Sequence, residues 1–376
     1  MTDLPALGVY VHWPYCARIC PYCDFNVVRD RGKTEEQAAL ARAIVRDLAA
    51  HRALTGPRRL VSIFFGGGTP SLMDAAYVAA IVDTATELWS PEPGLEVSLE
   101  ANPTDAEAGR FAGFAAAGVS RLSLGLQSLD DAALSFLGRN HDAGQARRAA
   151  EKAAALFPRL SLDLIYARPG QTVEAWTGEL ETAVALGAEH VSPYQLTIEA
   201  GTAFHRAVGR GGLIPTGEDL GADLFDTTQR VLEAHGFDAY EVSNHARGEG
   251  ARSRHNLVYW RGEDYVGVGP GAHGRLTLDG RVATTAPRKI GDYIEGAGFQ
   301  REPLSPREAA EERVLLGLRI DDGVAFEEVA ALGLRPSDRR VRDLVEAGML
   351  ADDPHRLRAT RAGRLVLDRV TAQLAS

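Results

Sequence analysis

A chain of 376 residues is too long for one small domain and predicts two or three compact units. Hydrophobic residues make up 45% and charged residues 24%, which is typical of a soluble globular protein. The formal net charge of −10 argues against a general nucleic-acid-binding protein, because such proteins normally present a basic face. The start of the chain lacks a basic stretch followed by an apolar one, and no apolar run approaches the ~20 residues that span a bilayer. We therefore expect no secretory signal and no membrane insertion.

Residues 9–198 alternate short β-branched runs with longer amphipathic patterns such as residues 34–54, which predict helices. The predicted strands are VYVHW, VSIFF, EVSLE, RLSLGL, LSLDLIY and HVSPYQLTI. Six strand–helix units in residues 1–200 predict a parallel sheet with crossover helices. This α/β pattern fits either an open doubly wound sheet or a partial (β/α)6 barrel similar to a TIM barrel.

Polar residues near the ends of these strands favour the barrel. The cysteines follow the first strand and residues 66–70 (GGGTP) follow the second, while Glu100, Gln127 and Asp163 lie on the third, fourth and fifth. The C-terminal ends of barrel strands form one mouth where chemistry takes place, so one site would collect all of these residues.

The remaining residues predict two further units. Residues 201–300 are rich in glycine and predict irregular structure around one helix, as an extension of the barrel. Residues 301–376 predict three short helices and a hairpin over GMLADDPHRLRATRAG, which is the pattern of a winged-helix-like domain. Residues 302–376 contain 12 Lys and Arg against 14 Asp and Glu. A packing or docking role is therefore favoured over DNA binding.

All three cysteines of the chain lie between Cys16 and Cys23. An odd, tightly spaced set is a poor disulfide framework and indicates metal or redox chemistry in a reducing, cytoplasmic setting. Three thiolates on an iron–sulfur cluster would leave one iron open to a small molecule. The alternatives are a zinc site that adds His12 to the cysteines, and a thioredoxin-like pair formed by Cys20 and Cys23.

The segment CARICPYC is a CxxxCxxC motif and resembles the signature of the radical S-adenosylmethionine (SAM) superfamily, and FFGGGTPS follows about one strand–helix unit later. The resemblance implies a 4Fe–4S cluster held by Cys16, Cys20 and Cys23. It also implies that SAM binds the open iron and is cleaved reductively to a 5′-deoxyadenosyl radical. The same resemblance assigns Gly67, Gly68 and Thr69 to the methionine end of SAM. Without it, three glycines would more often mark a tight turn.

The segments VYVHWPYC, SLEANP, SLGLQSLDDAALSFLGRNH and LDLIYARPGQT resemble the oxygen-independent coproporphyrinogen III oxidase group. This resemblance implies further SAM contacts, which are Tyr10 and Tyr22 beside the cluster, Glu100 on the ribose hydroxyls, and Gln127, Arg139 and Asp163. Each has a structural alternative: Glu100 as an ion-pair partner, Asp163 as a helix cap or a partner of Arg139, and the aromatic rings as a barrier to water.

Two features resemble the HemW-type heme chaperones within this group. Phe25 occupies the position where the oxidases carry a further cysteine, and residues 255–260 form an HNxxYW motif. This resemblance implies a protein that binds heme and delivers it to apoproteins such as respiratory enzymes, with His255 as the heme-iron ligand. His245 and His273, with Arg254 nearby, are secondary candidates for heme contacts. The structural alternative is that His255 hydrogen-bonds locally while Tyr259 and Trp260 fill the core. The functional alternative is a true oxidase that decarboxylates coproporphyrinogen III. Whether the chain forms a homodimer is left open.

Overall fold

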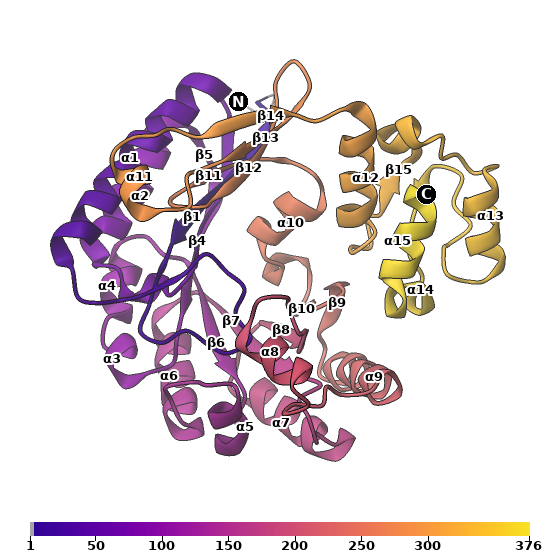
Figure 1. Cartoon of the computed structure of the whole chain (residues 1–376), viewed down its shortest axis with the longest axis horizontal. Coiled ribbons are helices and arrows are strands. Elements are labelled where there is room, and N and C mark those ends of the chain that lie inside the picture. Colours follow the sequence, from indigo (N-terminus) through magenta and orange to yellow (C-terminus); the bar gives the residue numbers. More distant parts are fainter. Residues whose placement is uncertain (1–3) are drawn as a thin grey trace.

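The computed structural model describes residues 4–376, except for the side chains of residues 105 and 106. Twelve strands form one sheet in the order β14-β13-β12-β11-β1-β4-β5-β6-β7-β8-β10-β9. The sheet curves around a central space, with helices along its outer face and the C-terminal residues beside its open side (Figure 1). None of the helices in residues 4–376 is long and apolar enough to cross a membrane.

All six strands predicted in residues 9–198 are present, and each pairs in parallel with the next. They are β1 (Ala6–Trp13), β4 (Arg59–Gly67), β5 (Ser90–Ala101), β6 (Arg121–Gln127), β7 (Arg159–Tyr166) and β8 (His190–Gln195). The predicted α/β partial barrel is therefore confirmed.

Several of the helices that connect these strands begin where the sequence supplies N-terminal caps. Asp142 and Gln145 form a capping box at the start of α6, and the Asp74 and Thr172 side chains cap α2 and α7. The predicted helix over residues 34–54 is α1. The connecting helices are α1 (Thr34–Thr55), α2 (Ala75–Leu88), α3 (Asp105–Ala108), α4 (Phe111–Ala116), α5 (Asp131–Phe136), α6 (Ala143–Leu156) and α7 (Val173–Ala185), with the 3-10 turn η1 (Pro70–Leu72).

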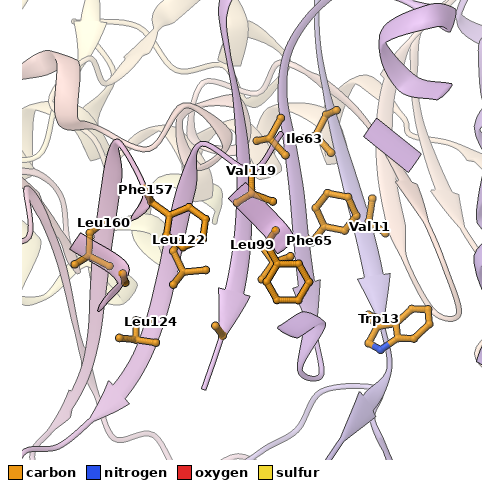
Figure 2. Packing of buried hydrophobic residues seen from close by; sticks show 14 of the residues in the cluster. Val11, Trp13, Ile63, Phe65, Leu99, Val119, Leu122, Leu124, Phe157 and Leu160 are labelled. Atoms are coloured by element: carbon orange, nitrogen blue, oxygen red, sulfur yellow. The ribbon is translucent and has the colours of Figure 1, made fainter. Parts of the chain in front are cut away.

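The main hydrophobic core lies between the sheet and these helices. Alternate residues of the strands point outward into it, for example Val11 and Trp13 of β1, Phe65 of β4 and Leu122 of β6, all of which are buried (Figure 2). Because side chains alternate along a strand, the intervening residues face the central space. The apolar residues therefore fix the register of the sheet, and the polar residues between them are free to form a site.

Residues 201–300 differ from the prediction, because much of this region joins the sheet instead of remaining irregular. β11 pairs in parallel with β1, and β12, β13 and β14 continue that edge in antiparallel order. At the other edge β10 pairs antiparallel with β8 and β9. The elements of this region are α8 (Ala203–Gly209), α9 (Glu218–Ala234), β9 (Asp238–Glu241), β10 (Asn244–Ala246), η2 (Glu249–Ala251), α10 (Arg254–Trp260), β11 (Asp264–Val268), β12 (His273–Thr277), β13 (Arg281–Thr285), α11 (Ile290–Ile294) and β14 (Gln300–Pro303).

The C-terminal residues form a second core of their own. Val314, Leu344 and Leu374 pack together from three helices. An antiparallel bridge joins Leu350 to Ala359 in the predicted hairpin, although β16 pairs with the more distant β15 and two helices follow it. The elements are α12 (Pro306–Gly317), β15 (Val324–Ala325), η3 (Phe326–Leu332), α13 (Arg339–Glu346), β16 (Arg356–Leu357), α14 (Arg361–Leu365) and α15 (Leu367–Ala375).

Candidate functional site

A cavity of about 400 Å³ lies inside the curved sheet, at the C-terminal ends of its parallel strands. Its wall comes from the inward-facing residues of β4 to β8 and from the loop that carries the cysteines. The predicted site residues that line this cavity are Cys16, Cys20, Tyr22, Cys23, Gly67, Gly68, Thr69, Glu100, Gln127, Arg139 and Asp163. The structure therefore brings together the residues that the motifs place far apart in the sequence.

The cysteine loop is closed by a short two-stranded ribbon and is held to the barrel by hydrogen bonds of Asn26. β2 (Tyr15–Cys16) pairs in parallel with β3 (Val28–Arg29). The ring of His12 contacts the carbonyl oxygen of Asn26 through Nε2 at 2.9 Å, and the Asn26 side chain donates to the carbonyl of Pro270 at 2.9 Å. All three thiols are free, and Cys16 is buried while Cys20 and Cys23 are partly exposed. The loop can therefore present its thiols to the cavity from a fixed base.

The glycine segment lies directly against this loop. Gly68 N–H donates to the carbonyl of Trp13 and Thr69 N–H donates to the carbonyl of Tyr15, both at 2.8 Å. A Cβ on Gly68 would lie 2.7 Å from these two carbonyl oxygens, and a Cβ on Gly67, whose φ is +103°, would lie 2.5 Å from the His12 ring. Glycine is required here because the backbone of β4 approaches the cysteine loop too closely for any side chain.

Arg139 connects the cysteine loop to the strand ends. Its guanidinium donates to Cys20 Sγ at 3.5 Å, to the carbonyl of Gly125 at 3.1 Å and to the side chain of Asn102. Within residues 4–376 its Nε atom is buried and has no hydrogen-bond partner. Gln127 nearby has a φ of +63°, a left-handed conformation that is uncommon outside glycine. Strained backbone of this kind and an unsatisfied buried donor are features of binding sites.

Two carboxyl groups line the cavity, Glu100 from β5 and Asp163 from β7. Burial first, and then the charge of Asp163, raise the pKa of Glu100 to about 8, while the Gly67 N–H opposes this shift. Burial likewise raises the pKa of Asp163 to about 6, while the neighbouring hydroxyls of Ser123 and Ser192 and the charge of Arg139 lower it. The Ser123 hydroxyl donates to Asp163 at 2.9 Å. The predicted Asp163–Arg139 partnership is thus electrostatic, because the hydrogen bond to Asp163 comes from Ser123 and Arg139 acts through its charge.

We expect Glu100→Gln to stabilise the chain at high pH. The folded-state pKa of Glu100 is about 8, which is above its ordinary value of 4.5. The stability that the protonated carboxyl contributes is therefore fully present below pH 4.5 and is lost as the pH rises through about 8. The variant should therefore exceed the wild type in free energy of unfolding above about pH 8 and match it near about pH 4.5. Urea unfolding at both pH values measures this difference. Glu35→Gln, on the exposed first turn of α1, is the control. Equal pH profiles for wild type and Glu100→Gln would contradict the expectation.

The donor set fits a cluster better than the alternative zinc site. Both ring nitrogens of His12 are engaged, Nδ1 with the Tyr10 hydroxyl at 3.1 Å and Nε2 with Asn26. In the part of the chain that the structure describes, no group of three or more His, Cys, Asp or Glu side chains is arranged to hold a single metal ion. A cubane cluster instead attaches each cysteine to a different iron and needs the thiols spread around a cavity. The guanidinium of Arg139 beside Cys20 also suits the negative charge of a thiolate-bound cluster.

Tyr10 and His255 do not line the cavity. His255 is 1% exposed, and its ring stacks on Phe64 with centroids 4.9 Å apart. Its Nδ1 contacts the Ser62 hydroxyl at 2.8 Å and its Nε2 contacts the Tyr259 hydroxyl at 2.7 Å. His245 is buried as well, whereas His273 on β12 is exposed. In this conformation His255 has the local partners of the structural alternative, and its role as a heme ligand stays a prediction.

Several cavity residues were not predicted from the sequence. They are Ser123, Ser161, Ser192 and Asn256, which all line the cavity. Ser123 lies four residues before Gln127 on β6, and Ser161 lies two residues before Asp163 on β7. Ser192 lies two residues before Tyr194, which lines the cavity from β8. Strand alternation could therefore have identified them. Asn256 could not be found in this way, because its helix α10 enters the central space through tertiary packing.

Comparisons with known proteins identify the family of this chain. The radical SAM superfamily model matches residues 10–183 and the HemN C-terminal domain model matches residues 304–366. The mitochondrial radical S-adenosyl methionine domain-containing protein 1 of Bos taurus is 41% identical, over 98% of this chain and 87% of that protein. The heme chaperone HemW of Mycobacterium tuberculosis is 37% identical over 98% of this chain and 94% of its own length. The Escherichia coli HemW is 38% identical, covering 79% of this chain and 78% of that protein.

Among solved structures, the Escherichia coli coproporphyrinogen III oxidase HemN is similar along the whole chain. Its TM-score is 0.80, and the match covers 99% of this chain and 91% of that one at 18% sequence identity. At this identity the likeness establishes a shared fold, which includes the C-terminal region as well as the partial barrel.

Proposed function

Because this chain belongs to the radical SAM superfamily, and within it to the family of HemW and radical SAM domain-containing protein 1, we propose that it is a heme chaperone. In this proposal it binds heme, carries a 4Fe–4S cluster and SAM in the central cavity, and passes heme to apoproteins. The observation that supports this role most directly is an apolar rim around the cavity that holds the cysteines.

Three large apolar side chains of the rim are exposed. Phe25 is 63%, Ile19 is 47% and Tyr194 is 42% exposed, and all three line the cavity. Exposed apolar groups gathered at one opening mark a binding surface, because covering them removes apolar area from water. A porphyrin offers a flat apolar face that aromatic rings can cover. Phe25, which replaces a cysteine of the related oxidases, would then contact the ligand.

The cavity residues divide between two resident groups. Cys16, Cys20 and Cys23 would hold the cluster, with Arg139 balancing its charge. A bound cluster would supply an iron with an open position and an electron for SAM cleavage. The SAM contacts proposed are Tyr10 and Tyr22 beside the cluster, Gly67, Gly68 and Thr69 at the methionine end, Glu100 at the ribose, and Gln127, Arg139 and Asp163. Tyr10 does not line the cavity, so it would influence the SAM site indirectly, through the contact of its hydroxyl with His12.

His255 is the proposed iron ligand in the heme-bound state. Imidazole is the commonest proximal ligand of heme iron. To bind iron, His255 Nε2 would have to release the Tyr259 hydroxyl, and α10 would have to open toward the cavity rim. Heme binding by this histidine therefore requires a change of conformation, whereas the rim residues need none.

Titrating heme into the anaerobically purified protein tests the proposal. We expect a shift of the Soret band with saturation at micromolar heme, because the rim buries one porphyrin face and His255 binds the iron. Phe25→Asp should weaken binding without changing stability, while Leu315→Asp, which alters a side chain on α12 that is 54% exposed, should have no effect. His255→Ala should change the Soret position, and its folding is checked by circular dichroism. No heme uptake at micromolar concentration would overturn the proposal.

The oxidase alternative predicts a different product. Incubation with reductant, SAM and coproporphyrinogen III, followed by mass spectrometry, should show no loss of carbon dioxide if the chain is a chaperone. Turnover to protoporphyrinogen would show that the chain is an oxidase and would overturn the chaperone proposal. Heme-requiring respiratory enzymes as recipients, a cytoplasmic location and a homodimer belong to the same proposal. Three free clustered thiols support the reducing location.

A further inference from the structure

Helix α10, which carries the HNxxYW motif, lies in the central space between the sheet and the C-terminal domain (Figure 1). Its His255 side fastens it to β4 through Ser62 and Phe64, as described above. Its other end is held by the C-terminal domain. Arg319 lies with Cζ 4.8 Å above the centre of the Trp260 ring, and Arg313 donates to the carbonyl of Trp260 at 3.1 Å. The motif therefore bridges two parts of the molecule.

Arg319 also reaches a buried acid at the edge of the sheet. Its Nε donates to Glu241 Oε1 at 2.6 Å, and Glu241 is fully buried. The second oxygen of Glu241 accepts from the Ser243 backbone N–H at 2.8 Å and from Asn244 Nδ2 at 2.7 Å. A buried carboxylate of this kind depends on its cation, because removing one partner leaves an uncompensated charge. The ion pair thus ties β9 and β10 to the C-terminal domain.

Asn244 connects Glu241 to two residues of the cavity wall. Since its Nδ2 points to Glu241, its Oδ1 faces the other way and accepts from Ser192 Oγ at 3.1 Å and from Asn256 Nδ2 at 3.3 Å. Ser192 and Asn256 both line the cavity, and Ser192 on β8 is the direct register partner of Asp163 on β7, so its hydroxyl can turn toward that carboxyl. One hydroxyl has one proton, so Ser192 can donate to Asn244 or to Asp163 but not to both.

We propose that Arg319 and Glu241 are positioning residues that couple the docking of the C-terminal domain to ligand binding at Asp163. With the ion pair formed, Asn244 is held in one orientation and takes the proton of Ser192, which leaves Asp163 with Ser123 and an acceptor site for a ligand hydroxyl or ammonium group. When the pair breaks, Asn244 is free to rotate and Ser192 donates to Asp163 instead. This inference rests on the proposed SAM site.

SAM binding to the full-length protein with its cluster reconstituted tests the coupling. We expect Arg319→Lys, which keeps the charge but loses the planar fork, to weaken SAM binding about threefold to thirtyfold. Asn244→Ala leaves the ion pair intact and should weaken SAM binding similarly. Arg261→Met is the matched control. It removes an exposed ion pair, 2.9 Å long, between Arg261 and Asp322 of the C-terminal domain, and this pair does not contact Glu241. The control should bind SAM as the wild type does.

The double variant separates positioning from general destabilisation. If Arg319 acts through Asn244, Arg319→Lys has no further effect on SAM affinity in the Asn244→Ala background, whereas independent structural damage multiplies the two losses. Wild-type SAM affinity in both single variants, or fully multiplicative losses, would overturn the inference while leaving the SAM site intact. If the wild-type protein itself does not bind SAM, the proposed SAM site fails first, and the coupling fails with it.

Discussion

Replacing any one of Cys16, Cys20 and Cys23 by alanine is expected to abolish the iron–sulfur cluster. Each thiolate would hold a different iron, and residues 4–376 contain no other cysteine to take its place. Iron and sulfide content after anaerobic reconstitution should fall to background, together with the broad visible absorbance. The fold should survive, because the three side chains line a cavity and removing one sulfur leaves the main core unchanged.

Ile19→Ala is the matched control for this result. Ile19 lies in the same loop, between Cys16 and Cys20, and is largely exposed. Its variant should retain full iron and sulfide, while its heme affinity falls if the rim binds porphyrin. Full iron content in any one cysteine variant would show that the ligand assignment is wrong. Zinc in place of iron in the wild-type protein would exclude the cluster altogether.

Gly68→Ala is expected to disrupt the contact between β4 and the cysteine loop. The added Cβ would lie 2.7 Å from the carbonyl oxygens of Trp13 and Tyr15, which are backbone atoms and cannot rotate away. Either β4 separates from the cysteine loop or the loop shifts, and overpacking of this kind costs about 1–3 kcal/mol or more. We expect a lowered melting temperature and loss of cluster incorporation, measured by calorimetry and iron content.

Gly178→Ala provides the comparison. Gly178 lies within α7, and a Cβ there would meet no atom within 4 Å. Because glycine is a poor helix former, this variant should be unchanged or stabilised by about 0.5–1 kcal/mol. If Gly68→Ala behaved in the same way, the close approach between β4 and the cysteine loop would not exist in solution.

The barrel strands could be predicted from the sequence because their signal is local. β1 alternates Leu7, Val9 and Val11 with Gly8 and Tyr10, so one face is apolar within a single short window. The strands of residues 201–300 carry a weaker signal, except β11, in which the buried Val266 and Val268 alternate with Tyr265 and Gly267. β10 is three residues long and all of them are buried, and β12 and β13 contain glycine, threonine and arginine. Their place in the sheet depends on partners far away in the sequence.

The difference between local signals and distant partners also explains which site residues could be predicted. Motif spacing after successive strands correctly predicted that the cysteines, the glycine segment and the acids of β5 and β7 would share one cavity. Spacing could not predict which residues of the HNxxYW motif reach the cavity, because α10 is short and is placed by contacts with β4 and with the C-terminal domain. Asn256 therefore reaches the cavity while His255, one residue earlier, lies behind Phe64. Only tertiary structure distinguishes the two.

The strand order that begins at β14 and finishes at β9 has a consequence for how a large ligand enters. A closed barrel can widen only by breaking a ladder of backbone hydrogen bonds. Here the seam between the two outermost strands is filled by α10 and the C-terminal domain, through side-chain contacts such as those of Arg313 and Arg319. Apart from one backbone bridge, between Glu241 of β9 and Ile320, such a seam can widen by rearranging side chains. A planar guest as broad as a tetrapyrrole could therefore be admitted and released while the pairing of the twelve strands stays intact.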